Sequence, residues 1–146
     1  MSAYMPQSKS QTHITPQRVY EIIKETWGYS QNEMFDPCPA NYNKDQYATP
    51  NGLFGDWQNV NYVNPPYEVK TLTKFVEKAI IEAKKGRVSI MLLPTKTDQD
   101  WFHDLIIKNY YQIKYIRKRL KFANHNQSSM GSHFLVKIIN LNEPNN

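Results

Sequence analysis

The sequence lacks three features that would each assign the chain to a different class of protein. Its single cysteine, Cys38, cannot form an internal disulfide, so we expect a reducing, cytoplasmic setting. No apolar run approaches the length of a membrane span, and residues 1–11 contain no hydrophobic stretch of the kind a signal peptide needs. No metal site is predicted, because metal-ligand spacing is absent among Cys38 and the four histidines, His13, His103, His125 and His133.

What the chain does contain is enough apolar material for one core, since 40% of its 146 residues are hydrophobic and 13% are aromatic. Both ends are polar. We therefore predict a single domain over residues 14–140, preceded by a mobile segment, residues 1–13, and followed by a polar tail, residues 141–146. The sequence leaves the oligomeric state open.

Positive charge is concentrated in the second half of the chain. The net charge is +5, but residues 1–73 carry −2 and residues 74–146 carry +7. The densest stretch, residues 108–121, has no carboxylate and alternates with aromatic residues, a pattern that favours a surface tracking nucleic-acid phosphates. The alternative is a solvated strand edge guarded by charge against aggregation. Its candidate phosphate ligands are Lys114, Arg117, Lys118, Arg119 and Lys121.

Hydrophobic periodicity predicts an α/β protein that begins with a helix. Thr15-Pro16 fits a cap followed by a first-turn proline, and Gly28 ends the apolar period. Alternating residues 60–63, an amphipathic segment from Glu68 and an apolar run over residues 88–93 then form a strand–helix–strand unit with parallel strands.

The remainder of the chain adds a helix that buries Trp101 and Phe102, and two alternating segments, residues 111–115 and 134–139, that are expected to pair antiparallel at the sheet edge. Only 28 positions separate Asp36 from Asn64, which is too few for the crossovers of a full-size sheet. The sheet is therefore expected to be abbreviated.

The turn Asn64-Pro65-Pro66-Tyr67 lies where the first strand of that unit ends and its helix begins. Its prolines fix a non-helical backbone. The side-chain oxygen of Asn64 and the carbonyl of Pro65 could each accept an N–H from an aromatic amine, which would stabilise positive charge that develops on its nitrogen during methyl transfer. The ring of Tyr67 offers a face on which a base turned out of its helix could stack.

This turn resembles the catalytic motif of amino-group methyltransferases that use S-adenosylmethionine. Over about residues 15–136 the order of motifs is similar to that of the small phage-type DNA N6-adenine methyltransferases. The series comprises Phe35-Asp36-Pro37-Cys38-Pro39, Asn51-Gly52-Leu53 with Trp57, the Asn64–Tyr67 turn, Leu92-Leu93-Pro94-Thr95-Lys96-Thr97-Asp98 with Trp101-Phe102-His103, and Arg119-Leu120-Lys121-Phe122.

The resemblance implies an abbreviated Rossmann-like fold, with a mostly parallel sheet and an antiparallel edge, that transfers methyl groups from S-adenosylmethionine to the N6 amine of adenine in DNA, inside a bacterial host cell if the chain is phage-encoded. It assigns catalysis to Asn64, Pro65, Pro66 and Tyr67. It assigns cofactor binding to Thr15, Asp36, Pro37, Cys38 and Thr95, and suggests that Tyr47, Thr49, Asn51, Gly52 and Trp57 wall the cofactor or the base.

Alternatives remain at this point. Asp36 could simply form a turn, Thr15 could simply cap a helix, and Cys38 suits packing better than nucleophilic chemistry. The glycine-rich Phe-x-Gly-x-Gly loop of larger relatives is absent. The same chemistry could act on RNA adenine or protein glutamine, or the chain could be a DNA-binding module of this fold without activity.

Overall fold

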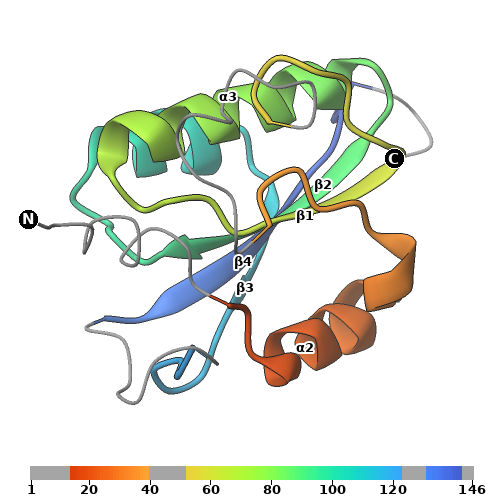
Figure 1. Ribbon diagram of the computed structural model, residues 1–146. Helices are drawn as coiled ribbons and strands as arrows, with labels where there is room; N and C mark the ends of the chain where they lie inside the picture. The colour runs from red at the N-terminus through yellow and green to blue at the C-terminus, as the bar shows by residue number, and fades with distance from the viewer. Residues whose placement is uncertain (1–13, 40–51, 123–130, 143–146) are drawn as a thin grey trace, which may run out of the picture.

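The computed structural model describes residues 14–39, 52–122 and 131–142 (Figure 1). Its elements are a mixture of helices and strands, as the periodicity predicts. They are α2 (Gln17–Trp27), the short 3-10 helix η1 (Gln31–Glu33), β1 (Val60–Val63), α3 (Val69–Lys84), β2 (Val88–Pro94), the π-helix η3 (Phe102–Ile107), β3 (Gln112–Tyr115) and β4 (His133–Ile138).

Four strands form one mixed sheet in the order β1-β2-β4-β3. The strands β1 and β2 pair parallel through the α3 crossover, with Val60 opposite Val88. The expected antiparallel pair at the edge is present as β3 and β4, but β4 also pairs antiparallel with β2. The antiparallel strand is therefore internal, so only one of the three pairings is parallel, and the description of the sheet as mostly parallel is corrected to mixed.

A fifth segment touches the sheet beside β1. Phe35 forms a parallel bridge with Asn61, through its N–H to the carbonyl of Val60 (2.9 Å) and its carbonyl to the N–H of Tyr62 (2.9 Å). The segment before Asp36 thus contributes only one bridging residue to the sheet. It nevertheless places Asp36 next to the carboxyl end of β1.

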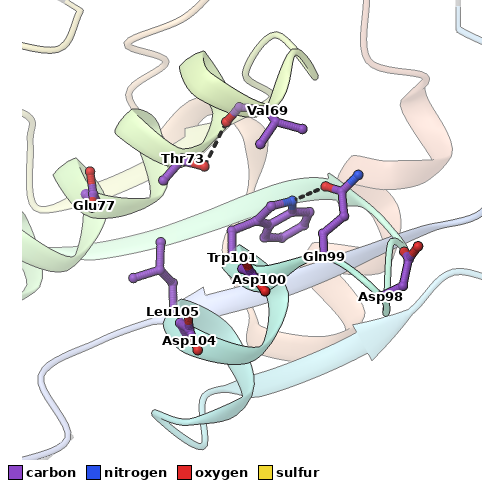
Figure 2. A pocket seen from close by; sticks show the side chains of 9 residues that line it. All are labelled: Val69, Thr73, Glu77, Asp98, Gln99, Asp100, Trp101, Asp104 and Leu105. Atoms are coloured by element: carbon purple, nitrogen blue, oxygen red, sulfur yellow. Dashed lines mark hydrogen bonds between the residues drawn. The ribbon is translucent and has the colours of Figure 1, made fainter.

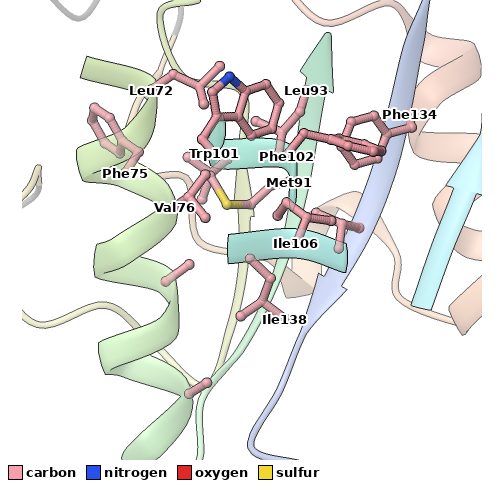
Figure 3. Close-up of a cluster of buried hydrophobic side chains, with 14 of the residues drawn as sticks. Leu72, Phe75, Val76, Met91, Leu93, Trp101, Phe102, Ile106, Phe134 and Ile138 are labelled. Atoms are coloured by element: carbon pink, nitrogen blue, oxygen red, sulfur yellow. The ribbon is translucent and has the colours of Figure 1, made fainter. Parts of the chain in front are cut away.

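Apolar side chains cover both faces of β2, as its continuous hydrophobic run predicts. Met91 and Leu93 face α3 and η3, and Figure 3 shows them packed with Leu72, Trp101 and Phe134. On the opposite face, Ile90 and Leu92 join a second cluster with Val19 and Ile23 of α2, together with Tyr62, Ile116, Leu120, Phe122 and Leu135. The two helices accordingly lie on opposite sides of the sheet (Figure 1).

The first helix starts one residue later than the sequence suggests. Pro16, with φ −66° and ψ 148°, is the N-cap of α2 rather than its first residue, and no side chain caps the helix. Gly28 ends it as expected, in the left-handed region at φ 84°, and donates its N–H to the carbonyl of Lys24 (2.9 Å). The hydroxyl of Thr15 is therefore not used as a helix cap.

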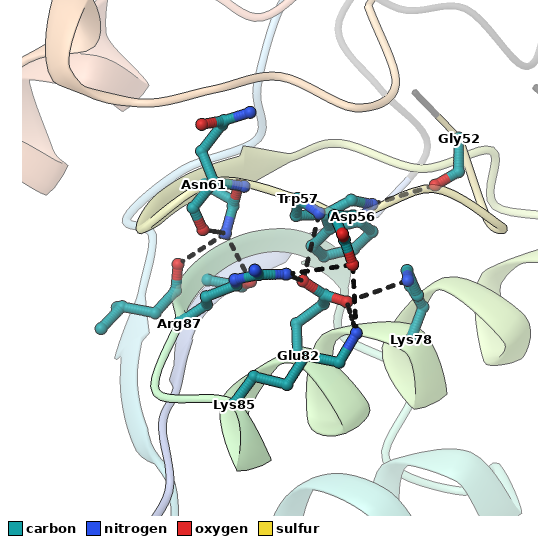
Figure 4. Close-up of polar contacts among 11 residues, drawn as sticks. Gly52, Asp56, Trp57, Asn61, Lys78, Glu82, Lys85 and Arg87 are labelled. Carbon is teal, nitrogen blue, oxygen red and sulfur yellow. Dashed lines mark hydrogen bonds and ion pairs between the residues drawn. The ribbon is translucent and has the colours of Figure 1, made fainter. Parts of the chain in front are cut away.

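A buried carboxylate ties α3 to the chain on either side of it (Figure 4). The Glu82 side chain has no exposed surface, and it accepts hydrogen bonds from Arg87 (2.6 Å), Lys78 (2.9 Å), Lys85 (3.1 Å) and the N–H of Trp57 (3.1 Å). Burial alone would raise the pKa of Glu82, but these donors outweigh it and lower the pKa from 4.5 to about 2.

Trp57 belongs to this structural cluster. Its side chain is 2% exposed, and its indole N–H donates to the carbonyl of Gly52 (2.9 Å), so it is a core residue rather than a wall open to a base. The other suggested wall residues, Tyr47, Thr49 and Asn51, lie outside the described residues.

Candidate active site

The Asn64–Tyr67 turn lies at one edge of the sheet, where the ends of three elements meet. Asn64 follows β1 directly, and β2 ends at Pro94, whose partner in the register is His133 at the start of β4. The N–H of Thr95 then donates to the carbonyl of Ser132 (2.9 Å). Residues from widely separated parts of the sequence therefore converge at the carboxyl ends of the parallel strands, where open α/β sheets bind ligands.

Four side chains form a continuous hydrogen-bonded row through this edge. The hydroxyl of Tyr67 donates to the side-chain oxygen of Asn64 (2.7 Å), and the amide nitrogen of Asn64 donates to the hydroxyl of Thr15 (3.4 Å). The Thr15 hydroxyl also bonds the hydroxyl of Tyr62 (2.8 Å). An acceptor on one side of the amide and a donor on the other fix its orientation, so the Asn64 oxygen points toward Tyr67.

Aromatic rings back this row. The ring of Tyr67, half-buried, lies 5.5 Å from the ring of His133, and His133 lies 5.5 Å from Phe122 at a steep angle. Tyr62 is buried and packs against Tyr20 with ring centroids 5.1 Å apart. Pro65 and Pro66 are buried as well. The turn therefore packs against a group of aromatic rings that contact one another.

A half-buried carboxylate lies beside the row. Asp36 accepts a hydrogen bond from the N–H of Cys38 (2.9 Å), which closes the tight turn that the sequence offered as one alternative. Burial raises the pKa of Asp36 from 3.8 to about 6, and the Cys38 N–H only partly offsets this. Its charge also acts on Tyr62 and Tyr20, so it lies close to the site.

Cys38 is buried and its thiol is free. Burial, followed by the nearby charge of Asp36, raises the pKa of the thiol well above its usual range. A thiol held protonated is a packing group rather than a nucleophile, in agreement with the structural reading of the sequence.

The candidate phosphate ligands occupy a single surface segment. Lys114, Arg117, Lys118, Arg119 and Lys121 are all exposed, whereas the intervening Ile116, Leu120 and Phe122 are buried in the cluster that also contacts Tyr67. The segment is tied to the active-site edge by the Ile116 N–H, which donates to the carbonyl of His133 (3.1 Å). Cations thus project outward from the same cluster that supports the turn.

A family model described as DNA N-6-adenine-methyltransferase (Dam) matches residues 2–144. The chain belongs to this family. Dam-family proteins are adenine-specific DNA methyltransferases, so the chain is an enzyme of that class, with DNA as the implied substrate and S-adenosylmethionine as the implied cofactor. The comparisons with curated proteins and with solved structures give no match.

The residues beside the turn suit the cationic cofactor of a Dam methyltransferase. Within the described residues no cation pairs with Asp36. A positive group that approaches a carboxylate with a raised pKa stabilises its ionised form. The hydroxyl oxygen of Thr95 is buried and has no hydrogen-bond partner in the part of the chain that the structure describes. The positive charges of S-adenosylmethionine would pair with the Asp36 carboxylate, and its polar ribose atoms would offer a hydrogen-bond partner to the Thr95 hydroxyl.

A separate cleft of about 500 Å³ is lined by Asp98 and Trp101 of the motif series but by none of the residues of the Asn64–Tyr67 turn (Figure 2). It lies between α3 and the segment around Trp101, and its lining includes the carboxylates of Glu77, Asp98, Asp100 and Asp104. Negative charge of this density repels DNA phosphates, so we do not assign the cleft to the Dam substrate.

Three contributors to the site were missed from the sequence: Tyr62, His133 and the actual role of Thr15. Tyr62 and His133 carry no motif signal, because a tyrosine in an alternating strand and a lone histidine are ordinary core residues.

No helix in the described residues is long and apolar enough to cross a membrane. Within the same residues no group of His, Cys, Asp or Glu could hold a metal ion.

Proposed function

We propose that this enzyme methylates the N6 amine of adenine in DNA at the Asn64–Tyr67 turn. The observation that carries the proposal is the fixed amide of Asn64, which Tyr67 and Thr15 hold from its two ends at the carboxyl edge of the sheet. A carbonyl-type oxygen has two lone pairs, so the Asn64 oxygen can accept an adenine N–H in addition to the Tyr67 hydroxyl.

Asn64 and Pro65 act on the amine. The nitrogen gains positive charge as it forms its new bond, and preorganised acceptors stabilise that charge more than they stabilise the ground state. Asn64 is 9% exposed, so only the edge of a base turned out of the duplex would reach it. The half-buried ring of Tyr67 then supports the base, and Pro66 fixes the direction of the turn.

S-adenosylmethionine, when bound, supplies a methyl carbon activated by its sulfonium. Asp36 would pair with the positive charge of the cofactor. Thr15, Thr95 and the backbone of Pro37 and Cys38 would line the same side of the site. Lys114, Arg117, Lys118, Arg119 and Lys121 would bind the DNA backbone.

The test is transfer of radiolabelled methyl from S-adenosylmethionine to unmethylated plasmid DNA, with matched RNA as a control and nucleoside mass spectrometry to identify the product. Asn64→Ala should lower the rate about 10²–10³-fold, the usual cost of one preorganised contact. Asn59→Ala is the matched control, because Asn59 is an exposed asparagine at the opposite end of β1.

Label in N6-methyladenine of DNA, lost in Asn64→Ala and kept in Asn59→Ala, would support the proposal. An Asn64→Ala rate within threefold of the wild type would remove Asn64 from the mechanism. Label entering RNA in preference to DNA would move the substrate assignment away from DNA.

A further inference from the structure

Arg18, in the first turn of α2, reaches across the sequence to the basic segment. Its Nη1 donates to the carbonyl of Arg117 (3.1 Å) and its Nη2 to the carbonyl of Arg119 (3.3 Å). The two acceptors are 99 and 101 positions from Arg18 in the sequence. A planar guanidinium with two parallel donors suits such a pair of carbonyls, whereas an ammonium could not span them in the same way.

The turn that Arg18 holds has an unfavourable conformation. Lys118, between the two carbonyls, has φ 65°, in the left-handed region that non-glycine residues rarely adopt. The side chains of Arg117, Lys118 and Arg119 are exposed and repel one another, since no carboxylate lies among them. Such a turn persists only where its surroundings determine it.

We propose that Arg18 is a positioning residue for DNA binding, which holds the backbone of residues 117–119 so that their three cations face the phosphates together. The inference rests on the proposed function, because it takes these cations as the DNA contacts. Thr15 lies one helical turn before Arg18 and contacts Asn64, so the start of α2 fixes the phosphate-binding turn and the catalytic amide relative to each other.

The test compares the wild type with Arg18→Lys, which keeps the positive charge but loses the two parallel donors of the guanidinium. Binding to an unmethylated duplex is measured by fluorescence anisotropy. The Kd should rise about five- to tenfold, because the loss of bidentate hydrogen bonds outweighs the retained charge. Lys24→Gln is the control, since it removes an exposed charge from the same helix without contact to the basic segment, and its Kd should change less than twofold.

A second readout needs no DNA. Trypsin cleaves after Arg117, Lys118 and Arg119 only when the turn opens, so Arg18→Lys should speed cleavage there several-fold while cleavage after Lys84 and Lys85 stays at the wild-type rate. Thermal melting of the variant checks that the fold is retained.

Each outcome decides the inference. A wild-type Kd for Arg18→Lys overturns it, and so does a raised Kd with unchanged trypsin cleavage, because Arg18 would then contact DNA directly. Failure of the proposed function is separate, since it would appear as absent methyl transfer by the wild type, whereas Kd and cleavage are measured without transfer.

Discussion

The carboxylate of Asp36 links cofactor affinity to pH. Because burial raises its pKa to about 6 in the free protein, a cationic ligand must compete with a proton at this oxygen. We expect the affinity for S-adenosylmethionine, measured by calorimetry, to be constant above about pH 7 and to fall as the pH drops through about 6. Asp36→Asn should bind about tenfold more weakly at pH 7.5 and lose the pH dependence; a wild type with equal affinity at pH 5 and pH 8 would contradict the assignment.

At the scale of single residues the sequence predicted candidate site residues but not their contacts. The sequence singled out Asn64, the prolines and Tyr67 as candidates for amine polarisation, and that role stays a prediction. The hydrogen bond from the Tyr67 hydroxyl to Asn64 could not be predicted, since it depends on a side-chain direction that tertiary packing, including the contact with His133, determines. Whether Tyr67 also stacks a base stays a prediction.

Among the elements, the start of α2 carries the most direct test. Thr15→Val removes the hydroxyl that joins Asn64 to Tyr62 and keeps the shape of the side chain. We expect kcat to fall about tenfold, the order of one lost hydrogen bond in the transition state, while Thr15→Ser stays within twofold of the wild type.

Thermal melting separates this role from helix capping. Because Thr15 does not cap α2 but bonds the hydroxyl of the buried Tyr62, Thr15→Val should cost about 1–3 kcal/mol of stability, and much less in a Tyr62→Phe background. A Thr15→Val variant with unchanged kcat would show that the Thr15 hydroxyl serves the structure alone, through Tyr62.

The Glu82 cluster makes the stability of α3 packing depend on pH, because the cluster needs the ionised carboxylate. A carboxylate whose pKa is lowered on folding contributes stability that is fully present above its unfolded pKa of 4.5 and is lost as the pH falls toward about 2. Chemical denaturation between pH 5 and pH 2 should show this loss. Glu82→Gln should cost about 2–3 kcal/mol at pH 7 and flatten that dependence; a variant as stable as the wild type would show that the cluster is dispensable.

Most element types could be predicted from periodicity, but Phe35 contributes a single bridge to the sheet rather than a strand. The order of the strands could not be predicted, because β4 enters the sheet between β2 and β3, and a hydrophobic pattern does not tell which neighbour a strand selects. The contacts of Arg18 could not be predicted for the same reason, because its partners lie 99 and 101 positions away in the sequence.

For the molecule as a whole, the division between an acidic first half and a basic second half predicts salt-sensitive binding. If the five cations from Lys114 to Lys121 each contact one phosphate, a plot of log K against log salt should have a slope of about −4.5. Lys121→Gln should reduce its magnitude by about 0.9, and Lys70→Gln, an exposed residue of α3, should leave it unchanged. A slope near zero would indicate that the basic segment does not bind DNA.

The internal position of β4 has a consequence for synthesis. Residues 133–138 pair with β2 and β3 and bring His133 to the edge that carries the Asn64–Tyr67 turn, yet they are synthesised after the other strands of the described residues. Until then the nascent chain exposes one side of its most apolar strand, β2, as an unpaired edge. The edge that carries the Asn64–Tyr67 turn is therefore completed only after residues 133–138 have been synthesised, and until then the unpaired edge of β2 favours aggregation.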